Sequence, residues 1–503
     1  MKRINLLKFV VCSSIIFSAV GCTDLDEELL DGFVQSNEEV GSVDIQATLQ
    51  SAYEGLRGFQ SQDLQFALCE ISSDALVGPT RGGDWDDNGQ WRQLHNHTWA
   101  PDHVLIRNTW NNLLTPVYNC NLIIEGGSGQ PVVEARFLRA FYYFYMIDFF
   151  GKAPYRLPGS RIEDNPLVWS RAEATAFVIS ELEEILPSLP ARVAGDPSIA
   201  NSDAAHFLLA KLYLNKGVFT SENPVGPYTF DAADMTKVVT HVDAISSSLE
   251  PNYWSNFEPT NNGSNEILFS SKNTLGNAGN IQSRWRQGQH YNQTPSGWNG
   301  FATVADYYST FQPTDARKSY STPQIINSFG NPVGFQEGQM YAPGGVTPLQ
   351  DRLGNPLIFT QSITMITSGS SLETAGVRAM KYVPDVNNID APDNDYVLMR
   401  YSDALLMKAE AILRGGSGSV GTILQDIAAR AGVAAAPNTL DGIYAERGRE
   451  LWLEGWRRND MVRFGTYLNQ RDLKPYASDP KYILFPIPAD ALFNANLTQN
   501  PGY

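Results

Sequence analysis

Tryptophan and tyrosine side chains gather in two segments that are otherwise rich in small polar residues. The first, RWRQGQHYNQTPSGW at residues 284–298, fits neither the helical period nor the strand alternation, and the second spans residues 81–110. Buried aromatic rings normally lie on regular elements, whose backbone polar groups are satisfied, so we expect some of these rings to face solvent. The seven rings are Trp85, Trp91, Trp99, Trp110, Trp285, Tyr291 and Trp298.

Recognition of a sugar is the chemistry that suits such rings. A pyranose presents C–H groups on its faces and hydroxyls around its rim, so an indole can cover the face while polar side chains bind the rim. We therefore predict a glycan-binding platform in which at least two rings are exposed together. The alternative is that the loop tryptophans fold back to seal the scaffold. The predicted glycan-binding residues are Trp85, Trp91, Trp285, Tyr291 and Trp298, with Arg81, Asp84, Asn292 and Gln293 at the rim.

A row of glutamates was considered for catalysis. Glu446, Glu450 and Glu454 recur every four residues, which places them on one face of a helix. A glycosidase needs two facing carboxyl groups, one with a raised pKa, but the arginines around this row would keep all three side chains ionised. We interpret the row as a structural ion-pair network, with Arg458 at the favoured spacing from Glu454.

No established catalytic motif supports an enzyme. The sequence contains no nucleophile elbow, Walker loop, dinucleotide fingerprint or HExxH motif. We predict a binding protein without catalytic residues, and a surface glycan hydrolase on a helical scaffold is the alternative.

The acidic turn DWDDNG was considered for calcium. Asp84, Asp86, Asn88 and Gly89 follow the order of a calcium-binding loop, in which oxygen ligands alternate and glycine permits the turn. The twelfth position is His95 rather than the glutamate that completes such a loop. We therefore expect a simple acidic turn and no cofactor, with calcium as the alternative. His95, His97 and His103 could ligate a transition metal, but we expect these histidines to form hydrogen bonds instead.

The first residues resemble a lipoprotein signal. Basic residues precede the apolar run 9–20, which is too short to span a bilayer. The run ends in Ala19-Val20-Gly21-Cys22, where two small residues precede a cysteine that would take a lipid. An acidic tether follows from residue 23. We predict a protein anchored to a membrane by lipid on Cys22, outside the cytoplasm. An ordinary secretory signal is the alternative.

Charge and cysteine content limit the remaining functions. The formal net charge is −17, and removal of residues 1–21 would remove three more positive charges. Such a surface repels phosphates, which excludes nucleic acid as a partner. No other apolar run is long enough to cross a membrane. Cys69 and Cys120 would remain after processing, and we favour two buried thiols over a disulfide, although pairing stays open.

Four segments have strong helical patterning. Residues 134–154 are apolar on nearly every side and predict a central buried helix. Segments 201–217 and 401–416 begin with Ser202 and Ser402 as expected N-caps and end at glycine. Their small alanines favour close, tetratricopeptide-like helix pairing. The fourth helix is expected within residues 441–465.

The region from about 218 to 395 is loop-rich and would carry the ligand site. We predict a mainly α fold in one compact unit, with a signal peptide (1–21), an N-terminal helical scaffold (22–217), a loop-rich subdomain (218–395) and a C-terminal helical scaffold (396–503).

The segments RFLRAFYYFYMIDFFGKAPY, YSDALLMKAEA, ERGRELWLEGWRRNDMVRFG and LFPIPADALFNANLTQNPGY, in this order after a lipid signal, resemble the SusD/RagB family of outer-membrane nutrient-binding lipoproteins. The resemblance implies a tetratricopeptide-like helical scaffold and a less regular subdomain that supplies most ligand contacts. It also implies capture of oligosaccharides at the cell surface without catalysis. Its implied partner is a SusC-like TonB-dependent transporter, over which the lipoprotein acts as a hinged lid. Some members of the family bind peptides or other nutrients, so a non-glycan ligand remains an alternative.

Overall fold

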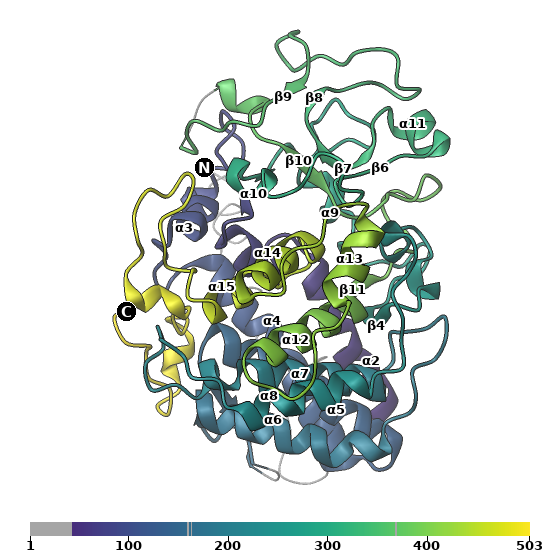
Figure 1. Cartoon of the computed structure of the whole chain (residues 1–503). Coiled ribbons are helices and arrows are strands. Elements are labelled where there is room, and N and C mark those ends of the chain that lie inside the picture. The colour runs from purple at the N-terminus through teal and green to yellow at the C-terminus, as the bar shows by residue number, and fades with distance from the viewer. Residues whose placement is uncertain (1–42, 158–159, 162, 368–369) are drawn as a thin grey trace, which may run out of the picture. The chain divides into compact units, whose positions relative to one another are not determined.

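Helices and short strands occupy different parts of the protein. The computed structural model describes residues 43–157, 160–161, 163–367 and 370–503. The predicted signal peptide and the lipid-acceptor Cys22 therefore lie outside the described residues. Residues Asp44–Tyr503 form one compact unit. Most of the long helices lie in the lower half of Figure 1, and the short strands β6 to β10 lie near its top. The mainly α fold is as predicted.

The bounds of the elements are as follows. The α-helices are α2 (Ile45–Glu54), α3 (Gln90–Asn96), α4 (Val104–Gly126), α5 (Gln130–Phe149), α6 (Arg171–Ile185), α7 (Ser202–Phe219), α8 (Ala232–Asp243), α9 (Ser283–Arg286), α10 (Ala305–Tyr308), α11 (Pro323–Phe329), α12 (Tyr401–Leu413), α13 (Ile423–Ala431), α14 (Leu440–Glu450) and α15 (Arg457–Arg463). The strands are β1 (Leu76–Val77), β2 (Lys152–Tyr155), β3 (Leu167–Ser170), β4 (Ile267–Ser271), β5 (Ala302–Thr303), β6 (Ser319–Tyr320), β7 (Val333–Gln336), β8 (Gly338–Gln339), β9 (Ile358–Phe359), β10 (Arg378–Met380) and β11 (Tyr396–Arg400).

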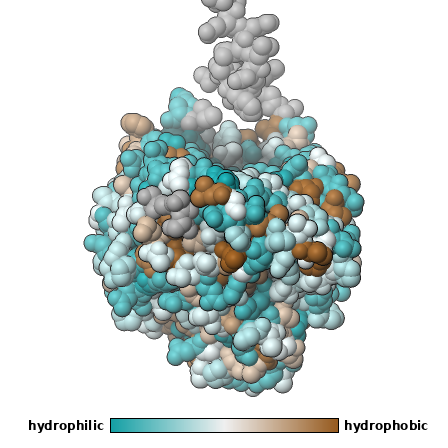
Figure 2. Space-filling model, turned by 90° about the horizontal axis from the view of Figure 1, so that it is seen from above, coloured by the Kyte–Doolittle hydropathy of each residue, from teal (hydrophilic) through white to brown (hydrophobic). Residues whose placement is uncertain are grey.

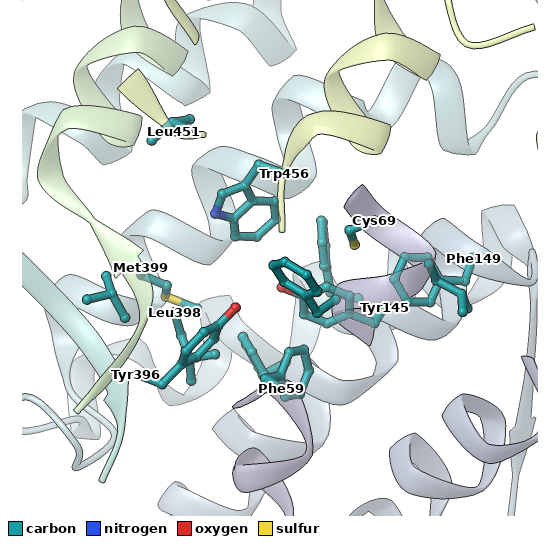
Figure 3. Close-up of a cluster of buried hydrophobic side chains, with 14 of the residues drawn as sticks. Phe59, Cys69, Tyr145, Phe149, Tyr396, Leu398, Met399, Leu451 and Trp456 are labelled. Atoms are coloured by element: carbon teal, nitrogen blue, oxygen red, sulfur yellow. The ribbon is translucent and has the colours of Figure 1, made fainter. Parts of the chain in front are cut away.

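Helix α5 is the centre of the core, as its pattern predicts. Every residue from Phe137 to Phe149 is buried, and the helix packs against α4, α6 and α7. It ends where predicted, because Gly151 adopts the left-handed conformation with φ of 65°. Tyr145 and Phe149 point into a cluster that also holds Phe59, Trp456 and residues of β11 (Figure 3).

Helices that follow each other in the chain pack as neighbours. Helix α4 packs along α5, α6 along α7, and α7 along α8, while α12 packs on α8 and α14. These contacts confirm the predicted scaffold of helical pairs. Helix α8 lies within the predicted loop-rich region, yet its packing groups it with the scaffold. The boundary at residue 218 therefore does not separate the helical layer from the loops.

Three predicted helix ends differ from the structure. The N-cap of α7 is Asn201, whose side chain accepts a hydrogen bond from the N–H of Ala204, so Ser202 is the first residue of the helix. The helix also continues past Gly217. That glycine is required by a close approach, because a Cβ atom there would lie 2.1 Å from the carbonyl oxygen of Thr229. Likewise, α12 begins before Ser402, and Gly415 follows its end.

The fourth predicted helix is interrupted. Helices α14 and α15 are separated by residues 451–456, in which Leu453 and Gly455 have φ values of 55° and 82°. An α-helix cannot continue through left-handed residues. The predicted pair of Glu454 with Arg458 is therefore not formed, and Arg458 pairs with Asp148 of α5 instead.

The loop-rich region holds small antiparallel sheets. Strand β7 lies between β6 and β10, β8 pairs with β9, and β4 pairs with β11. Strand β1, from the N-terminal part of the chain, pairs with β5. Cys69 and Cys120 are free and buried. None of the described helices is long and apolar enough to cross a membrane.

Candidate functional site

The two aromatic segments meet in the structure. Pairing of β1 with β5 places Leu76 opposite Thr303, which brings the chain after β1 next to the chain before β5. The indole N–H of Trp85 then donates to the carbonyl oxygen of Trp298 at 2.7 Å. The Tyr291 hydroxyl donates to the Asp84 carboxylate at 2.8 Å. A joint surface built from residues 81–99 and 284–298 is therefore present, as the platform prediction requires.

Trp85, Tyr291 and Trp298 are the predicted platform rings that remain partly exposed. The Trp85 ring is backed by Trp91 and Phe301, with centroids 5.5 and 5.0 Å away. Trp85 has a φ of 62°, an unusual conformation for a bulky residue. Such strain persists only where the surroundings hold it and is concentrated at binding sites. We call Trp85, Tyr291 and Trp298 the aromatic site.

Charged side chains hold Tyr291 in place. The Arg352 guanidinium lies over the Tyr291 ring, 4.7 Å from its centroid, and bonds to Asp84 at 3.0 Å and to Glu373 at 3.1 Å. Burial and the hydrogen bond to Asp84 raise the pKa of Tyr291 to about 12, so its hydroxyl is neutral. Burial alone would raise the pKa of Glu373, but bonds from Arg352 and His290 keep it below its usual value.

His290 joins the same cluster through both ring nitrogens. Its Nδ1 accepts the backbone N–H of Asn292 at 3.1 Å, so we assign the proton to Nε2, which lies 2.9 Å from Glu373. Asn292 itself is exposed, and its side-chain amide donates to the carbonyl oxygen of Gln350. Asp84 and Asn292 therefore lie beside the Tyr291 ring.

Several predicted site residues lie elsewhere. Trp285 and Trp91 are 0% and 3% exposed, so neither ring can stack on a sugar, and their assignment to the platform is wrong. Trp99 and Trp110 are buried too. For these four rings the alternative interpretation, sealing of the scaffold, is correct. In the case of Trp285, the short helix α9 gives the segment enough regularity for the ring to enter the core.

Arg81 and Gln293 are also buried and serve the loops rather than a ligand. The Arg81 guanidinium donates to the carbonyl oxygens of Gly300, Leu372 and Ala375, which ties three loops together. Gln293 bonds to the backbone of His290 and to Gln336. Backbone groups in buried loops lack ladder partners, so Arg81 donates to such carbonyl oxygens and Gln293 accepts the N–H of His290.

Arg352 and Glu373 were missed by the sequence analysis. They lie in a segment without periodic pattern, far along the chain from both aromatic clusters. No motif in the sequence could have linked them to Tyr291.

The acidic turn takes arginine partners. Asp84 pairs with Arg352 and Asp86 with Arg92, while Asp87 accepts the indole N–H of Trp91 at 2.6 Å. Within the described residues, no group of three or more His, Cys, Asp or Glu side chains is placed to hold a metal ion. The structure thus adds nothing in favour of calcium at Asp84, Asp86 and Asn88.

The three histidines near the turn contact backbone carbonyl oxygens. His95, His97 and His103 lie within 3.3 Å of the carbonyls of Asp472, Ser72 and Gln90. Burial, followed by the charge of Arg471, lowers the pKa of His95 to about 3, so its ring is neutral. These histidines fasten loops to the scaffold.

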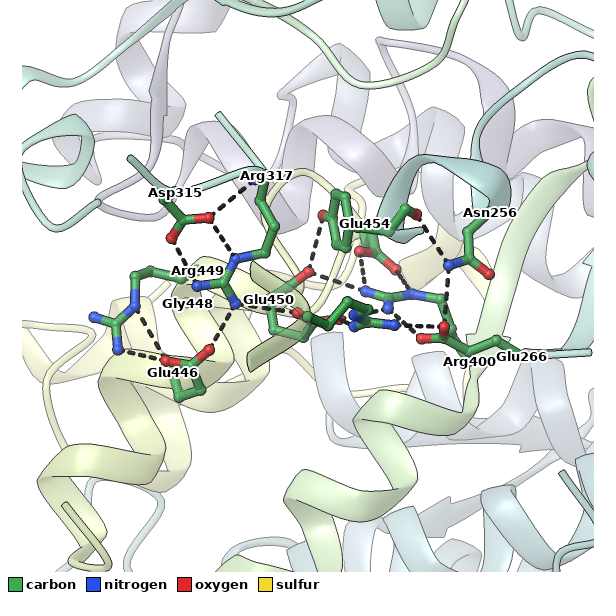
Figure 4. Close-up of polar contacts among 12 residues, drawn as sticks. Asn256, Glu266, Asp315, Arg317, Arg400, Glu446, Gly448, Arg449, Glu450 and Glu454 are labelled. Carbon is green, nitrogen blue, oxygen red and sulfur yellow. Dashed lines mark hydrogen bonds and ion pairs between the residues drawn. The ribbon is translucent and has the colours of Figure 1, made fainter. Parts of the chain in front are cut away.

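The glutamate row is a buried ion-pair network (Figure 4). Glu446 bonds to Arg317 and Arg449, and Glu454 bonds to Arg400. Glu450 faces three arginines, which are Arg317, Arg400 and Arg430. Burial alone would raise the pKa of Glu450, but these guanidinium groups hold it far below its usual value. An ionised, fully paired carboxylate cannot act as a general acid, so the structural interpretation is confirmed.

Comparison with known proteins identifies the family. Residues 265–503 match the model of the SusD family. The starch-binding protein SusD of Bacteroides thetaiotaomicron is 26% identical over 467 residues, which cover 83% of this chain and 82% of that protein. These matches confirm the resemblance to the SusD/RagB family.

Solved structures show the same fold. Surface glycan-binding protein A from Bacteroides fluxus superposes with a TM-score of 0.68 at 20% identity, over 91% of this chain and 99% of that chain. The protein of the same name from Bacteroides thetaiotaomicron, in complex with laminarihexaose, gives 0.64 at 19% identity, over 91% and 98% of the two chains. SusD-like proteins bind ligands and are not enzymes, so the prediction of a non-catalytic protein is confirmed.

Proposed function

We propose that this protein captures glycans at the cell surface through the aromatic site. The meeting of three partly exposed rings from two distant segments carries this proposal. The rings would cover sugar faces while Asp84, Asn292 and Arg352 bind rim hydroxyls. The names of the relatives, which refer to starch, laminarin and surface glycans, support the same ligand class.

The charges at the site favour a neutral glycan. Arg352 lies over the Tyr291 ring, and it is already bonded to two carboxylates. The adjoining turn carries Asp84, Asp86 and Asp87 in a chain with a net charge of −17. A carboxylate or sulfate on a sugar would meet these side chains without a free counter-charge, and like charges repel. We therefore propose neutral oligosaccharides as the substrate class.

Delivery to a transporter and attachment to the outer membrane complete the proposal. The resemblance to SusD proteins supports a SusC-like TonB-dependent transporter as the partner, and the Ala19–Cys22 pattern supports a lipid anchor. Replacing Cys22 with Ala should release the protein from the membrane fraction and abolish incorporation of labelled fatty acid. Continued labelling of the variant would show that the anchor is elsewhere.

Calorimetry tests the ligand site. The soluble chain from Thr23 onward is titrated with maltoheptaose and laminarihexaose. Loss of a stacking ring costs about 1–3 kcal/mol by analogy with stacking on bases, so Trp85→Ala or Trp298→Ala should weaken binding roughly tenfold or more. Phe493→Ala is the matched control, because Phe493 is an exposed aromatic residue (91%) outside the site. Equal affinity of the parent, both tryptophan variants and the control would contradict the proposal.

A further inference from the structure

A groove lies between α2 with its following turn and one face of α4. It is open to solvent and has a volume of about 390 Å³, which falls within the range of small-molecule sites. Leu64 and Pro116 contribute its apolar surface, and asparagine side chains of α4 contribute most of its polar surface. None of the residues of the aromatic site lines this groove.

Two glycines keep the walls of the groove in close contact. A Cβ atom on Gly55 would lie 2.4 Å from the Pro116 ring, and one on Gly58 would lie 2.2 Å from the Asn112 side chain. Neither distance is compatible with a real side chain. The turn after α2 can approach α4 this closely only because both positions are glycine, so the shape of the groove depends on particular residues.

Pro116 changes the hydrogen bonding of α4 inside the groove. Proline has no backbone N–H, so the carbonyl oxygen of Asn112 cannot receive its usual bond from position 116 of the helix. The side-chain oxygen of Asn112 accepts the Gln65 amide at 2.7 Å. The carbonyl oxygen of Asn112 thus loses its regular helical partner, and the Asn112 side chain is held by Gln65.

Three further asparagines on this face have free amides. Asn108, Asn111 and Asn119 follow the spacing of one helical face. In the described part of the chain, their side-chain amides make no hydrogen bond to protein. Each amide offers donors and an acceptor together. A sugar hydroxyl also donates and accepts, whereas a charged ligand would need counter-charges, and none of the described groove-lining residues is charged.

We propose that this groove is a second site for a neutral saccharide, separate from the aromatic site. Hydroxyls of the ligand bond to the amides of Asn108, Asn111 and Asn119. The C–H face of a sugar ring rests on Leu64. No aromatic ring lines the groove, so binding depends on hydrogen bonds and is weak, with a dissociation constant in the millimolar range.

Hydrogen–deuterium exchange with maltoheptaose and with laminarihexaose locates the binding. The soluble chain from Thr23 onward should show slower exchange in peptides 45–64 and 104–119 at millimolar saccharide. Asn108→Ala/Asn119→Ala should lower the saccharide affinity measured from this protection about tenfold, because two hydrogen bonds are lost. Trp85→Ala/Trp298→Ala should leave it unchanged. Val104→Ala is the control on the same helix, since Val104 is exposed and does not line the groove.

The outcomes separate this proposal from the aromatic site. Protection that disappears in the asparagine variant and persists in the tryptophan variant supports the groove, even if the aromatic site binds nothing. The groove proposal is overturned if both saccharides leave these peptides unprotected, or if protection survives the asparagine substitutions. It is also overturned if protection disappears with the tryptophans alone.

Discussion

At the scale of single residues, Trp285 and Trp298 show how one loop divides its rings between core and surface. Trp285 belongs to α9 and is fully buried, whereas Trp298 remains partly exposed and its carbonyl oxygen holds the Trp85 indole. The two residues share a type and a loop, so composition alone could not separate them. The short helix α9 separates them, because it directs Trp285 into the core.

Stability measurements should distinguish these two tryptophans. Trp285→Ala should lower the free energy of unfolding by about 3–5 kcal/mol, because it leaves a large cavity in the core. Trp298→Ala should cost much less, because part of its ring already faces water. Denaturant unfolding of the two variants and the parent measures the difference. If Trp285→Ala has the same free energy of unfolding as the parent, the assignment of Trp285 to the core is wrong.

Gly300 should control the position of the Trp85 ring. A Cβ atom at Gly300 would lie 2.5 Å from the indole, so Gly300→Ala must displace the ring from the aromatic site. We expect roughly tenfold weaker oligosaccharide binding, as for loss of a stacking ring. Gly83→Ala is the matched control in the neighbouring turn, where an added Cβ atom meets nothing within 4 Å. Equal calorimetric affinity of the two variants would contradict this role.

At the scale of elements, the C-terminal glutamates show which part of the structure a local pattern can determine. Their spacing and the surrounding arginines correctly predicted a structural ion-pair network. The arginines that bond to Glu450, however, come from distant positions 317, 400 and 430. The break at Leu453 and Gly455 could not be predicted from the hydrophobic pattern, because only the backbone conformation of these residues interrupts the helix.

The aromatic site also depends on contacts between distant segments, which a local pattern does not determine. Helices such as α5 could be predicted because periodic burial is visible within one segment. Tyr291, Asp84 and Arg352 meet only through loop conformations and the β1–β5 pairing, so sequence reasoning found the first two and missed the third. Ring exposure depends on the same long-range packing, and for this reason Trp91 and Trp285 were misassigned.

Removal of one member of the network should be costly. Glu450→Gln leaves Arg317, Arg400 and Arg430 short of one buried counter-charge, and breaking a buried pair from one side costs about 3–5 kcal/mol. Denaturant unfolding at neutral pH measures this loss. Glu184→Gln is the control, because Glu184 pairs with Arg136 at the surface and such pairs contribute little. Similar stability of the two variants would show that the network is not critical.

At the scale of the whole molecule, the negative charge and the hydrophilic surface both support the proposed preference for neutral ligands. The chain carries a net charge of −17. The face in Figure 2 is mostly hydrophilic, with small and separate hydrophobic patches. The long-range field therefore repels anionic polymers before they reach the aromatic site. At the site itself, Arg352 is already paired with Asp84 and Glu373.

The dependence of affinity on salt concentration tests the proposed preference for neutral glycans. Binding of a neutral oligosaccharide such as maltoheptaose forms no ion pair, so its affinity should be the same at low and high ionic strength. An oligogalacturonate of similar length should show no binding at low salt, where repulsion acts over roughly 30 Å. Screening at 1 M salt shortens that distance to about 3 Å, yet the acidic sugar would still meet Asp84 without a counter-charge. Calorimetry of both ligands at both salt concentrations measures the effect. Tighter binding of the oligogalacturonate at low salt would mean that a cation in the site is available to ligand, and the preference for neutral glycans would then be wrong.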